Sequence, residues 1–386
     1  MAKYKLGDIC EIVSGSTPKT GIDEYWDGDI KWITPAELDE TSYIITDSVR
    51  KITELAVKKT GLLPLQKGTV ILSSRAPIGK VAIAGCEMYC NQGFKNLICS
   101  DVIINKYLYW FLKANTAFLN SLGRGATFKE ISKAIVSEIE INVPSLSEQE
   151  NAVANLEKIS QVVALRKQQL TLLDDLKKAR FVEMFGDPVD NPMGWNKKRL
   201  QDIVSDDCSI SYGIVQTGDG KEEGVPVFRP VDIVNRVPKL DELKKTTEEI
   251  SNKYKRTILK GREMLITVRA NIADTCIVGE EFKGCNVGRG IVPIRTNEDI
   301  MILEFLKYLM DSKHLNDDIK RKAKGITLIQ LNMEDLREVE LIIPPVEQQK
   351  IFVNFAKKIN KSKATIQKAL DEAQLLFDSL MQQYFG

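Results

Sequence analysis

The sequence predicts a mixed α+β protein in which two similar α/β domains are separated by an antiparallel coiled coil of two long helices, with an internal pseudo-two-fold repeat. The first observation behind this prediction is the repeat itself. Leu6-Gly7-Asp8-Ile9 recurs as Leu200-Gln201-Asp202-Ile203, and Phe185-Gly186 recurs as Phe385-Gly386. These offsets of 194 to 200 positions far exceed the 20–50 residues of a solenoid repeat. A unit of one domain plus one helix was therefore duplicated, which points to a partner with two related sites.

The second observation is how the offset of the repeat changes along the chain. It grows from 194 to 200 within the globular halves and then stays constant through the predicted helices. Loops therefore accepted insertions while helix length was kept, as expected of a spacer that sets a distance. The matched segments inside the globular halves are Arg75-Ala76 with Arg269-Ala270, Cys90-Asn91-x-Gly93 with Cys285-Asn286-x-Gly288, and Gly125-x-Thr127 with Gly325-x-Thr327.

Residues 1–146 and 187–346 are predicted to form the two α/β domains. In both, short apolar runs typical of strands alternate with Gly, Pro and Asn turns. One helical stretch is clear in each half, at 105–113 and at 303–310. Each half has enough residues to bury a hydrophobic core of its own.

Residues 147–186 and 347–386 are predicted to form two long spacer helices. Neither segment contains Pro, and neither contains Gly before its final residue, which is unusual for so long a stretch of a globular protein. Pro144 and Pro344 precede the segments and a glycine ends each one, as is typical of helix starts and ends.

Apolar residues in both segments recur at the spacing of three and four that is typical of a coiled-coil seam. Each helix should be about 55–60 Å long, and a helix with such a stripe needs a partner. We therefore expect the two helices to pair antiparallel; the alternative is that each packs only on its own domain. Ser147 and Glu150 have the spacing of a capping box. The predicted seam consists of Leu156, Ile159, Val163, Leu170, Leu173 and Leu176, interrupted by Arg166, and of Phe352, Phe355, Ile359, Ser362, Ile366, Ala369, Ala373, Leu376 and Leu380.

Composition excludes several classes of function. The chain carries 54 basic and 53 acidic residues, so it lacks the strong positive charge that is usual for a stand-alone DNA-binding protein. Any DNA contact must use local basic loops or share phosphate neutralisation with a partner. His314 is the only histidine, which excludes nearly every His-based triad or zinc site, and we expect it to be a solvated side chain. Seven cysteines without a CxxC pair, no membrane-length apolar run and no signal peptide together predict a cytoplasmic protein with reduced, mostly buried thiols.

Three further segments, taken with the duplication, carry a resemblance to a known family. They are Gly-Ser-Thr-Pro-Lys at 15–19, the Pro-x-x-x-Glu-Gln pattern at 144–149, and the helix end Phe181-Val-Glu-Met-Phe-Gly-Asp187. In this order and spacing, the whole chain resembles the specificity subunits of type I restriction–modification systems. The second helix start, at 344–349, follows the pattern only loosely, because its Glu lies one place earlier.

The resemblance implies a division of labour within a complex. Each domain would be a target recognition domain that reads one half of a gapped, asymmetric sequence in double-stranded DNA, and the paired helices would set the gap. The helices would also dock two modification subunits, which carry S-adenosylmethionine and methylate adenine. ATP-dependent restriction subunits can join such a complex. The chain itself would bind no cofactor or metal and would be non-catalytic.

The absence of enzyme motifs agrees with this division of labour. No Asn/Asp-Pro-Pro-Tyr/Phe methyltransferase signature is present, and Asp187-Pro-Val-Asp-Asn-Pro192 lacks the aromatic residue and follows a helix, so we expect a linker there. Gly79-Lys80 lacks the other residues of a phosphate-binding loop. Two alternatives stay open. One is a fused methyltransferase or nuclease, which the missing motifs disfavour, and the other is a coiled-coil scaffold without a DNA role.

DNA contacts require particular types of residue. Arg reads guanine and Asn or Gln reads adenine, whereas Lys, Arg, hydroxyls and the N–H groups of glycine-rich loops contact phosphates. The candidates in the first domain are Ser16, Thr17, Lys19, Arg75, Asn91, Gln92, Arg124, Thr127 and Lys129, and those in the second are Tyr212, Gln216, Thr217, Arg229, Arg269, Asn271, Asn286, Arg289, Lys324 and Thr327.

The matched candidates allow more than one role. Arg75 and Arg269 follow predicted strands, so a shared structural salt bridge is as much expected as a DNA contact. The two Gly-x-Thr loops lie beside basic residues, which favours phosphate binding. Asn91 and Asn286 are matched between halves that should read different bases, which favours a structural or phosphate role. Base-reading residues should lie where the repeats differ. The differing pairs are Gln92 against Val287 and Phe94 against Arg289.

Overall fold

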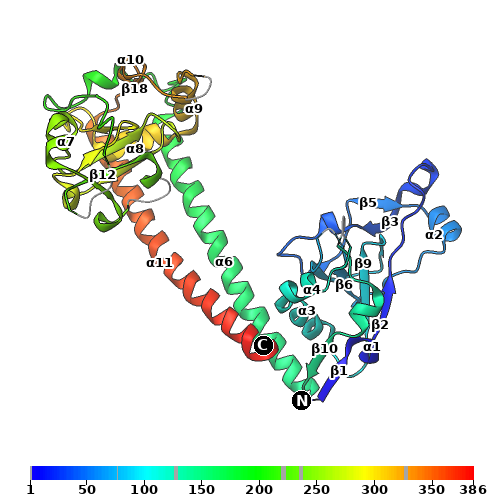
Figure 1. The fold of residues 1–386 in the computed structure, drawn as a ribbon. Coiled ribbons are helices and arrows are strands. Elements are labelled where there is room, and N and C mark those ends of the chain that lie inside the picture. Colours follow the sequence, from blue (N-terminus) through cyan, green and yellow to red (C-terminus); the bar gives the residue numbers. More distant parts are fainter. Residues whose placement is uncertain (1, 76, 126–128, 219–222, 234–237, 326–328) are drawn as a thin grey trace. The chain divides into compact units, whose positions relative to one another are not determined.

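The chain forms two compact units, each of which is described here by itself (Figure 1). Unit 1 consists of residues 1–168 and 367–386, and unit 2 of residues 169–366. Both predicted helices therefore contribute residues to both units. The structure is a computed structural model, and it describes residues 2–75, 77–125, 129–218, 223–233, 238–325 and 329–386.

Unit 1 is built on a five-stranded sheet with the strand order β2-β9-β6-β7-β4. Neighbouring strands are antiparallel except β4 and β7, which are parallel. The central strands β6 (Val70–Ser73) and β7 (Val81–Ala84) are buried along their whole length, which explains their continuous apolar runs. The outer strands are β2 (Cys10–Ser14), β9 (Phe94–Cys99) and β4 (Ile44–Ile45).

Two smaller sheets and five helices complete the domain of unit 1. Helix α3 (Asn105–Ala114) packs on β6 and β7, and Tyr107, Leu108 and Leu112 on this helix are buried in the main core. The small sheets are β5-β3-β8 (Arg50–Ile52, Trp26–Ile33, Tyr89–Cys90) and the pair β1-β10 (Ala2–Lys5, Glu140–Val143). The other helices are α1 (Leu6–Ile9), α2 (Glu54–Thr60), α4 (Thr116–Ser121) and α5 (Lys133–Ser137).

Unit 2 repeats this design, but its main sheet has three strands where that of unit 1 has five. Strand β14 (Glu263–Thr267) is buried along its length and lies between β15 (Thr275–Val278) and β17 (Ile291–Ile294), as β6 lies between β7 and β9. Helix α8 (Leu303–Asp311) packs on β14 and β15. The other strands are β12 (Val225–Phe228) between β13 (Lys244–Thr246) and β16 (Asn286–Val287), and the pair β11 (Lys197–Arg199) and β18 (Glu340–Ile342). The other helices are α7 (Glu248–Lys253), α9 (Lys313–Arg321) and α10 (Met333–Arg337).

The two long helices are α6 (Leu146–Phe185) and α11 (Val346–Phe385), with 40 residues each. The capping box expected at Ser147 and Glu150 is wrong, because α6 begins earlier. Ser145 and Glu148 form it instead: the Ser145 backbone N–H and hydroxyl donate to Glu148 Oε2 at 2.9 and 2.7 Å. At the other end Gly186 has φ +72°, the left-handed conformation that ends helices.

The expected antiparallel pairing of the helices is confirmed within both units. In unit 1, the Tyr384 hydroxyl near the end of α11 accepts a hydrogen bond from Asn155 near the start of α6, at 3.0 Å. In unit 2, the Phe181 ring near the end of α6 lies 5.3 Å from the Phe352 ring near the start of α11. The alternative of two helices that pack only on their own domains is therefore wrong.

The predicted seam is correct in most positions, but Leu176, Ser362 and Leu376 are exposed. The exposed fractions of Leu176 and Leu376 are 49% and 51%, whereas Leu370 is only 8% exposed and Phe377 packs against Trp110 of α3 at 5.8 Å. The straight α-helix repeats every 3.6 residues rather than every 3.5, so a strict heptad stripe drifts around its surface. Apolar side chains on the two helices therefore also face outward.

Among the seven thiols, those of Cys10, Cys90, Cys276 and Cys285 are buried. Burial raises the pKa of the Cys90 and Cys276 thiols to about 12, so both stay protonated at neutral pH. No helix in the described part of the chain is both long and apolar enough to cross a membrane.

Candidate nucleic-acid interface

A short loop follows the central strand of each domain and presents one of the matched arginines. In unit 1 this loop comprises the described residues 74, 75 and 77–79, and the Ser73 hydroxyl holds it by donating to Pro77 O (2.7 Å) and accepting from Lys80 N (2.8 Å). Gly79 N also donates to Ser73 O, at 3.0 Å. Arg75 lies within this loop, which we call the first arginine loop.

The second arginine loop, residues 268–273 of unit 2, is held in the same way. The Thr267 hydroxyl accepts from Asp274 N at 3.0 Å and bonds Asn271 O, and Ala273 N donates to Thr267 O at 2.8 Å. Ala270, directly after Arg269, has φ +60°. This left-handed conformation costs a residue with a side chain about 1 kcal/mol, and such strain is common at functional sites.

A backbone bridge lies beside each arginine loop and closes the Gly-x-Thr segment. In unit 1, Arg124 and Glu130 exchange two backbone hydrogen bonds of 3.0 Å, and Glu130 also bridges Arg75. In unit 2, Lys324 and Gln330 exchange bonds of 2.9 and 3.0 Å, and Gln330 bridges Arg269. Thr127 and Thr327 lie outside the described residues.

Backbone pairing corrects the alignment of the two halves after β8 and β16. Asn91 N donates to Ile33 O and Gly288 N to Phe228 O, at 3.1 and 2.8 Å, and these two acceptors end the equivalent strands β3 and β12. Asn91 therefore corresponds to Gly288, an offset of 197, and the match of Cys90-Asn91 to Cys285-Asn286 is wrong. The same shift pairs Gln92 with Arg289, both of which are exposed.

The corrected alignment also changes the expected positions of base-reading residues. The pairs Gln92 against Val287 and Phe94 against Arg289 do not correspond. Phe94 is a core residue of β9 that pairs with Ser73 and is 0% exposed, and its equivalent in β17 is the equally buried Ile291. The informative difference is therefore Gln92 against Arg289.

Two glycines at corrected equivalent positions allow the loops to approach the arginines closely. A Cβ on Gly93 would lie 3.0 Å from Pro35 Cγ and 3.5 Å from Arg75 Nε. A Cβ on Gly290 would lie 2.5 Å from Pro230 Cγ and 3.4 Å from the Cβ of Arg269. A side chain at Gly290 would force its neighbours to move, and one at Gly93 would be tightly packed, which favours glycine at both positions.

The structure brings most of the predicted residues of the first domain, and half of those of the second, into one group of loops in each domain. In unit 1, Thr17 bonds the side chain of Gln92, and Gly93 then adjoins Arg75. In unit 2, Arg289 N donates to Ile214 O at 2.8 Å, and Gly290 adjoins Arg269. We call the first group (15–19, 91–93, the first arginine loop, Arg124, Lys129 and Glu130) the first loop cluster. The second loop cluster comprises 212–214, 288–290, the second arginine loop, Lys324 and Gln330.

The predicted residues differ in how much surface they offer to a ligand. Asn286 is fully buried and its amide oxygen accepts from Thr257 Oγ1 at 2.7 Å, so its side chain supports the fold. Asn91 accepts from Gly93 N at 2.8 Å, which shapes the turn, and Arg229 is paired with Asp232 at 2.7 Å. Tyr212, Thr17 and Thr217 are partly buried. The exposed candidates are Ser16, Lys19, Gln92, Arg124, Lys129, Gln216, Asn271, Arg289 and Lys324.

Sequence reasoning missed three residues that determine the surroundings of the arginines. Lys95 is only 8% exposed and its Nζ lies 3.1 Å from Glu130 Oε1. Gln330 Oε1 accepts from Arg269 Nη2 at 2.5 Å. Neither arginine forms a salt bridge within the described residues, so the expected shared salt bridge is not found there. One signal in the sequence could have found two of them. Positions 130 and 330 correspond at the repeat offset of 200, and one carries a glutamate where the other carries the matching amide, glutamine.

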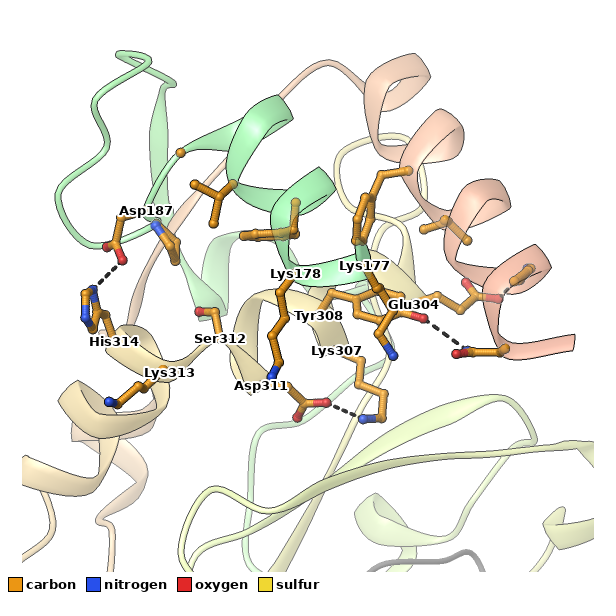
Figure 2. Close-up of a pocket in the computed structure, with 18 of the residues that line it drawn as sticks. Lys177, Lys178, Asp187, Glu304, Lys307, Tyr308, Asp311, Ser312, Lys313 and His314 are labelled. Carbon is orange, nitrogen blue, oxygen red and sulfur yellow. Dashed lines mark hydrogen bonds and ion pairs between the residues drawn. The ribbon is translucent and has the colours of Figure 1, made fainter. Parts of the chain in front are cut away.

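A second feature of interest is a pocket of about 670 Å³ in unit 2, where the end of α6 meets α8 and the start of α11 (Figure 2). Phe181, Phe352 and Tyr308 give it an apolar lining, and Lys177 and Lys307 are among the charged side chains around it. Burial raises the pKa of the Tyr308 hydroxyl.

The only histidine of the sequence lies at the edge of this pocket, and its side chain is exposed as expected. His314 is 61% exposed, but its Nδ1 contacts Asp187 Oδ2 (Figure 2). The pKa of Asp187 lies below its usual value. Burial alone would raise this pKa, but hydrogen bonds from the backbone of Val189 and Asp190 and the contact with His314 lower it. Asp187, Asp190 and His314 have potential ligand atoms within 4.8 Å of one another, but the histidine and the two backbone donors already account for the Asp187 carboxylate.

Each of the two α/β domains presents exposed basic side chains around an arginine loop and is joined to the long helices. This arrangement is typical of a protein that recognises DNA at two sites. The profile of the type I restriction modification DNA specificity domain matches residues 1–174 and again residues 192–374. The chain therefore belongs to this family and contains two copies of its domain.

Individual relatives agree with this assignment. The type I restriction enzyme MjaIX specificity subunit of Methanocaldococcus jannaschii is 33% identical over 369 residues, which cover 88% of this chain and 82% of the relative. The EcoBI specificity subunit of Escherichia coli is 23% identical over 305 residues, covering 73% and 64%. The crystal structure of the type I S subunit from M. genitalium has a similar fold, with a TM-score of 0.62 at 15% identity over 100% of this chain and 96% of that one.

Proposed function

We propose that this chain is the DNA-recognition subunit of a type I restriction–modification complex, in which each loop cluster reads one half of a bipartite target in double-stranded DNA. The observation that carries the proposal is that one loop scaffold is built twice with different exposed side chains. Gln92 and Arg289 occupy the same corrected position, and these residue types prefer adenine and guanine. Equivalent scaffolds with different side chains suit an asymmetric target with two different halves.

The charge distribution supports binding within a complex rather than by the chain alone. The net charge is +1, so attraction to the DNA backbone must come from local groups such as Arg124 and Lys129 in unit 1 and Lys324 in unit 2. Phosphate contacts of this kind position a protein on the duplex without reading its sequence. We expect weak, salt-sensitive binding by the isolated chain and tight binding only when partner subunits add further phosphate contacts.

The paired helices are the proposed docking site for two modification subunits, which bind S-adenosylmethionine and methylate adenine. Support comes from apolar side chains that face outward in the described structure: Leu172 and Val182 of α6 are 57% and 58% exposed, and Leu375 of α11 is 72% exposed. Contiguous exposed apolar patches mark protein interaction surfaces, and Val182 also lines the pocket of unit 2. ATP-dependent restriction subunits would join the same complex, in the cytoplasm, and the chain itself would be non-catalytic.

The test is methylome sequencing of cells that contain the modification subunit with and without this chain. We expect one gapped, two-part methylated sequence that appears only when the chain is present. Exchange of residues 187–345 for the corresponding segment of another family member should change one half of that sequence and leave the other unchanged. Changes in both halves would contradict two independent reading domains.

Gel shifts of the complex distinguish the remaining alternatives. Equal affinity for the methylated target and for random duplexes would favour a coiled-coil scaffold without DNA specificity. Methyl transfer by the purified chain with S-adenosylmethionine alone would favour a fused methyltransferase.

A further inference from the structure

We propose that Gln330 is a positioning residue that holds Arg269 for a directed contact with a base edge in the half-site of unit 2, with guanine as the matching base. The equivalent Arg75 contacts a phosphate of the other half-site instead. This inference rests on the proposed function, because it names the side chain of the second loop cluster that reads sequence.

Arg269 is held in one orientation by several independent contacts. Its Nη2 donates to Gln330 Oε1 at 2.5 Å, and its backbone is bridged to Gln330. The loop on which it lies is fixed by the hydroxyl of Thr267. An arginine reads guanine through two parallel hydrogen bonds to O6 and N7, so the plane of the guanidinium must be fixed before the contact forms.

The type of residue at position 330 also matters for the charge. A glutamate there would orient Arg269 but would cancel its positive charge. The carbonyl of an amide orients the guanidinium and leaves the whole charge, together with the remaining N–H groups, available to DNA. The Arg269 Nε is buried and has no hydrogen-bond partner within the described residues, so a contact with a base would use the Nη1 and Nη2 groups.

Arg75 has a different environment although its backbone position is the same. The acid at the position of Gln330 is Glu130, and its carboxylate is bound to the buried Lys95 at 3.1 Å. The described residues provide no hydrogen bond or ion pair to the side chain of Arg75. An arginine without such support suits a phosphate, which accepts hydrogen bonds from many directions and carries no base identity.

The differences between the halves are linked in a way that supports separate roles. Lys95 pairs with Leu72 in the sheet of unit 1, and its equivalent Val292 pairs with Ile266 in unit 2. A buried lysine requires a counterion, which Glu130 supplies. Where valine replaces the lysine, the counterion is no longer needed, and a neutral glutamine is free to support the arginine.

The first experiment changes the DNA and leaves the protein intact. It uses the complex of this chain with its modification subunits and a duplex with the target that methylome sequencing defines. Each guanine of the second half-site is replaced in turn by 7-deazaguanine, which lacks the N7 acceptor. We expect one position at which affinity falls about 10-fold, and we expect the Arg269→Ala complex to be insensitive to that replacement. The proposal is overturned if no position is sensitive, or if the sensitivity persists in the Arg269→Ala complex.

The second experiment compares matched variants of the two arginines. Arg269→Lys keeps the charge but loses the planar fork, so we expect about 10- to 100-fold weaker binding to the target and relaxed selectivity at one base pair. Arg75→Lys should change affinity less than about threefold, and Arg75→Ala should weaken binding to target and random duplexes alike and reduce the salt slope by about 1. Relaxed base selectivity in Arg75→Lys but not in Arg269→Lys would reverse the assignment.

Gln330→Met tests the positioning role, because methionine has a similar length but cannot accept the hydrogen bond. We expect selectivity to relax at the same base pair as in Arg269→Lys, with the first half-site unaffected and the thermal unfolding temperature unchanged within a few degrees. Equal losses at both half-sites, or unchanged selectivity, would exclude this role. If the wild-type complex showed no sequence preference at all, the proposed function itself would fail, an outcome distinct from the failure of Arg269 alone.

Discussion

Gln149 and Gln349 make the same three hydrogen bonds in the two halves of the molecule, and both side chains are fully buried. Each carboxamide oxygen accepts from a backbone N–H just before α3 or α8, and each amide nitrogen donates to two backbone carbonyls, with all distances between 2.8 and 3.0 Å. These bonds fix the start of each long helix to its domain. The partners are Ile104, Val102 and Pro144 for Gln149, and Ile302, Ile300 and Pro344 for Gln349.

Loss of either glutamine should destabilise its unit. Gln149→Leu or Gln349→Leu leaves buried backbone groups without partners, so we expect a decrease of about 2–3 kcal/mol in the free energy of unfolding. Urea unfolding monitored by circular dichroism measures the change. Gln161→Leu, at an exposed position of α6, is the control and should change stability by less than about 0.5 kcal/mol. Equal effects of all three substitutions would contradict this account.

The ion pair between the helices should make unit 2 sensitive to acid. Lys363 of α11 donates to Asp174 of α6 at 2.6 Å, and this bond lowers the pKa of Asp174. Because the pKa is lower in the folded state, the stabilisation is present above the unfolded pKa of about 4 and is lost as pH falls through the folded pKa. The side chains are 38% and 29% exposed, so solvent screening limits the contribution to about 0.5–1 kcal/mol.

Asp174→Asn should therefore lower stability by this amount at pH 7 and by progressively less as pH falls below about 4, as measured by urea unfolding across the range. Asp175→Asn is the matched control, because the neighbouring Asp175 is 63% exposed and pairs only within α6, with Lys178 at 3.7 Å. A pH-independent difference between wild type and Asp174→Asn would show that the ion pair does not act in this way.

Relief of backbone strain beside Arg269 should stabilise unit 2. Ala270 is exposed and has φ +60°, which glycine adopts without a steric cost. We expect Ala270→Gly to raise the free energy of unfolding by about 0.5 kcal/mol, since the gain exceeds the added entropy of the unfolded chain. Ala154→Gly, the same change at an exposed position inside α6, should instead destabilise by about 1 kcal/mol. Thermal unfolding compares the two, and a loss of stability in both would rule out strain at Ala270.

Shortening both helices by one heptad should shorten the gap of the recognised sequence. Deletion of residues 164–170 and 364–370 removes about 10 Å from each helix, which corresponds to about three base pairs at 3.4 Å per pair. Methylome sequencing should find both half-sites unchanged and the gap reduced. Deletion from one helix alone is the control, because it breaks the register of the pair and should abolish methylation. New half-sites in the doubly shortened protein would contradict the role of the helices as spacers.

Much of the fold could be predicted because the duplication shows each element twice. The two long helices and their antiparallel pairing follow from the spacing of apolar residues and the absence of internal Gly and Pro. The start of α6 could not be placed in the same way, because Ser145-x-x-Glu148 and Ser147-x-x-Glu150 have equal spacing. The buried contacts of Gln149 decide between them, and these depend on a loop more than 40 residues away.

The candidate site was predictable in its residue types but not in its register. Sequence identity aligned Asn91 with Asn286. The parallel pairing of β12 with β16, compared with the equivalent pairing in unit 1, aligns Asn91 with Gly288 instead. The offset between the halves grows from 194 at β7 and β15 to 197 at β8 and β16, so an insertion of three residues precedes β16. Only hydrogen bonds between strands that are distant in sequence reveal it. The roles of Glu130 and Gln330 were hidden for a similar reason, since their partners are 35 and 61 residues away in the chain.

The division of α11 between the two units has a consequence for how the protein is made. Residues 367–386 belong to unit 1, where Phe377 and Phe385 pack against Trp110 and Tyr107 of α3. During translation, the first domain emerges from the ribosome before the last turns of α11. The aromatic surface around Tyr107 and Trp110 therefore stays exposed to solvent until those turns have been synthesised. A nascent chain of this kind should rely on chaperones for that interval.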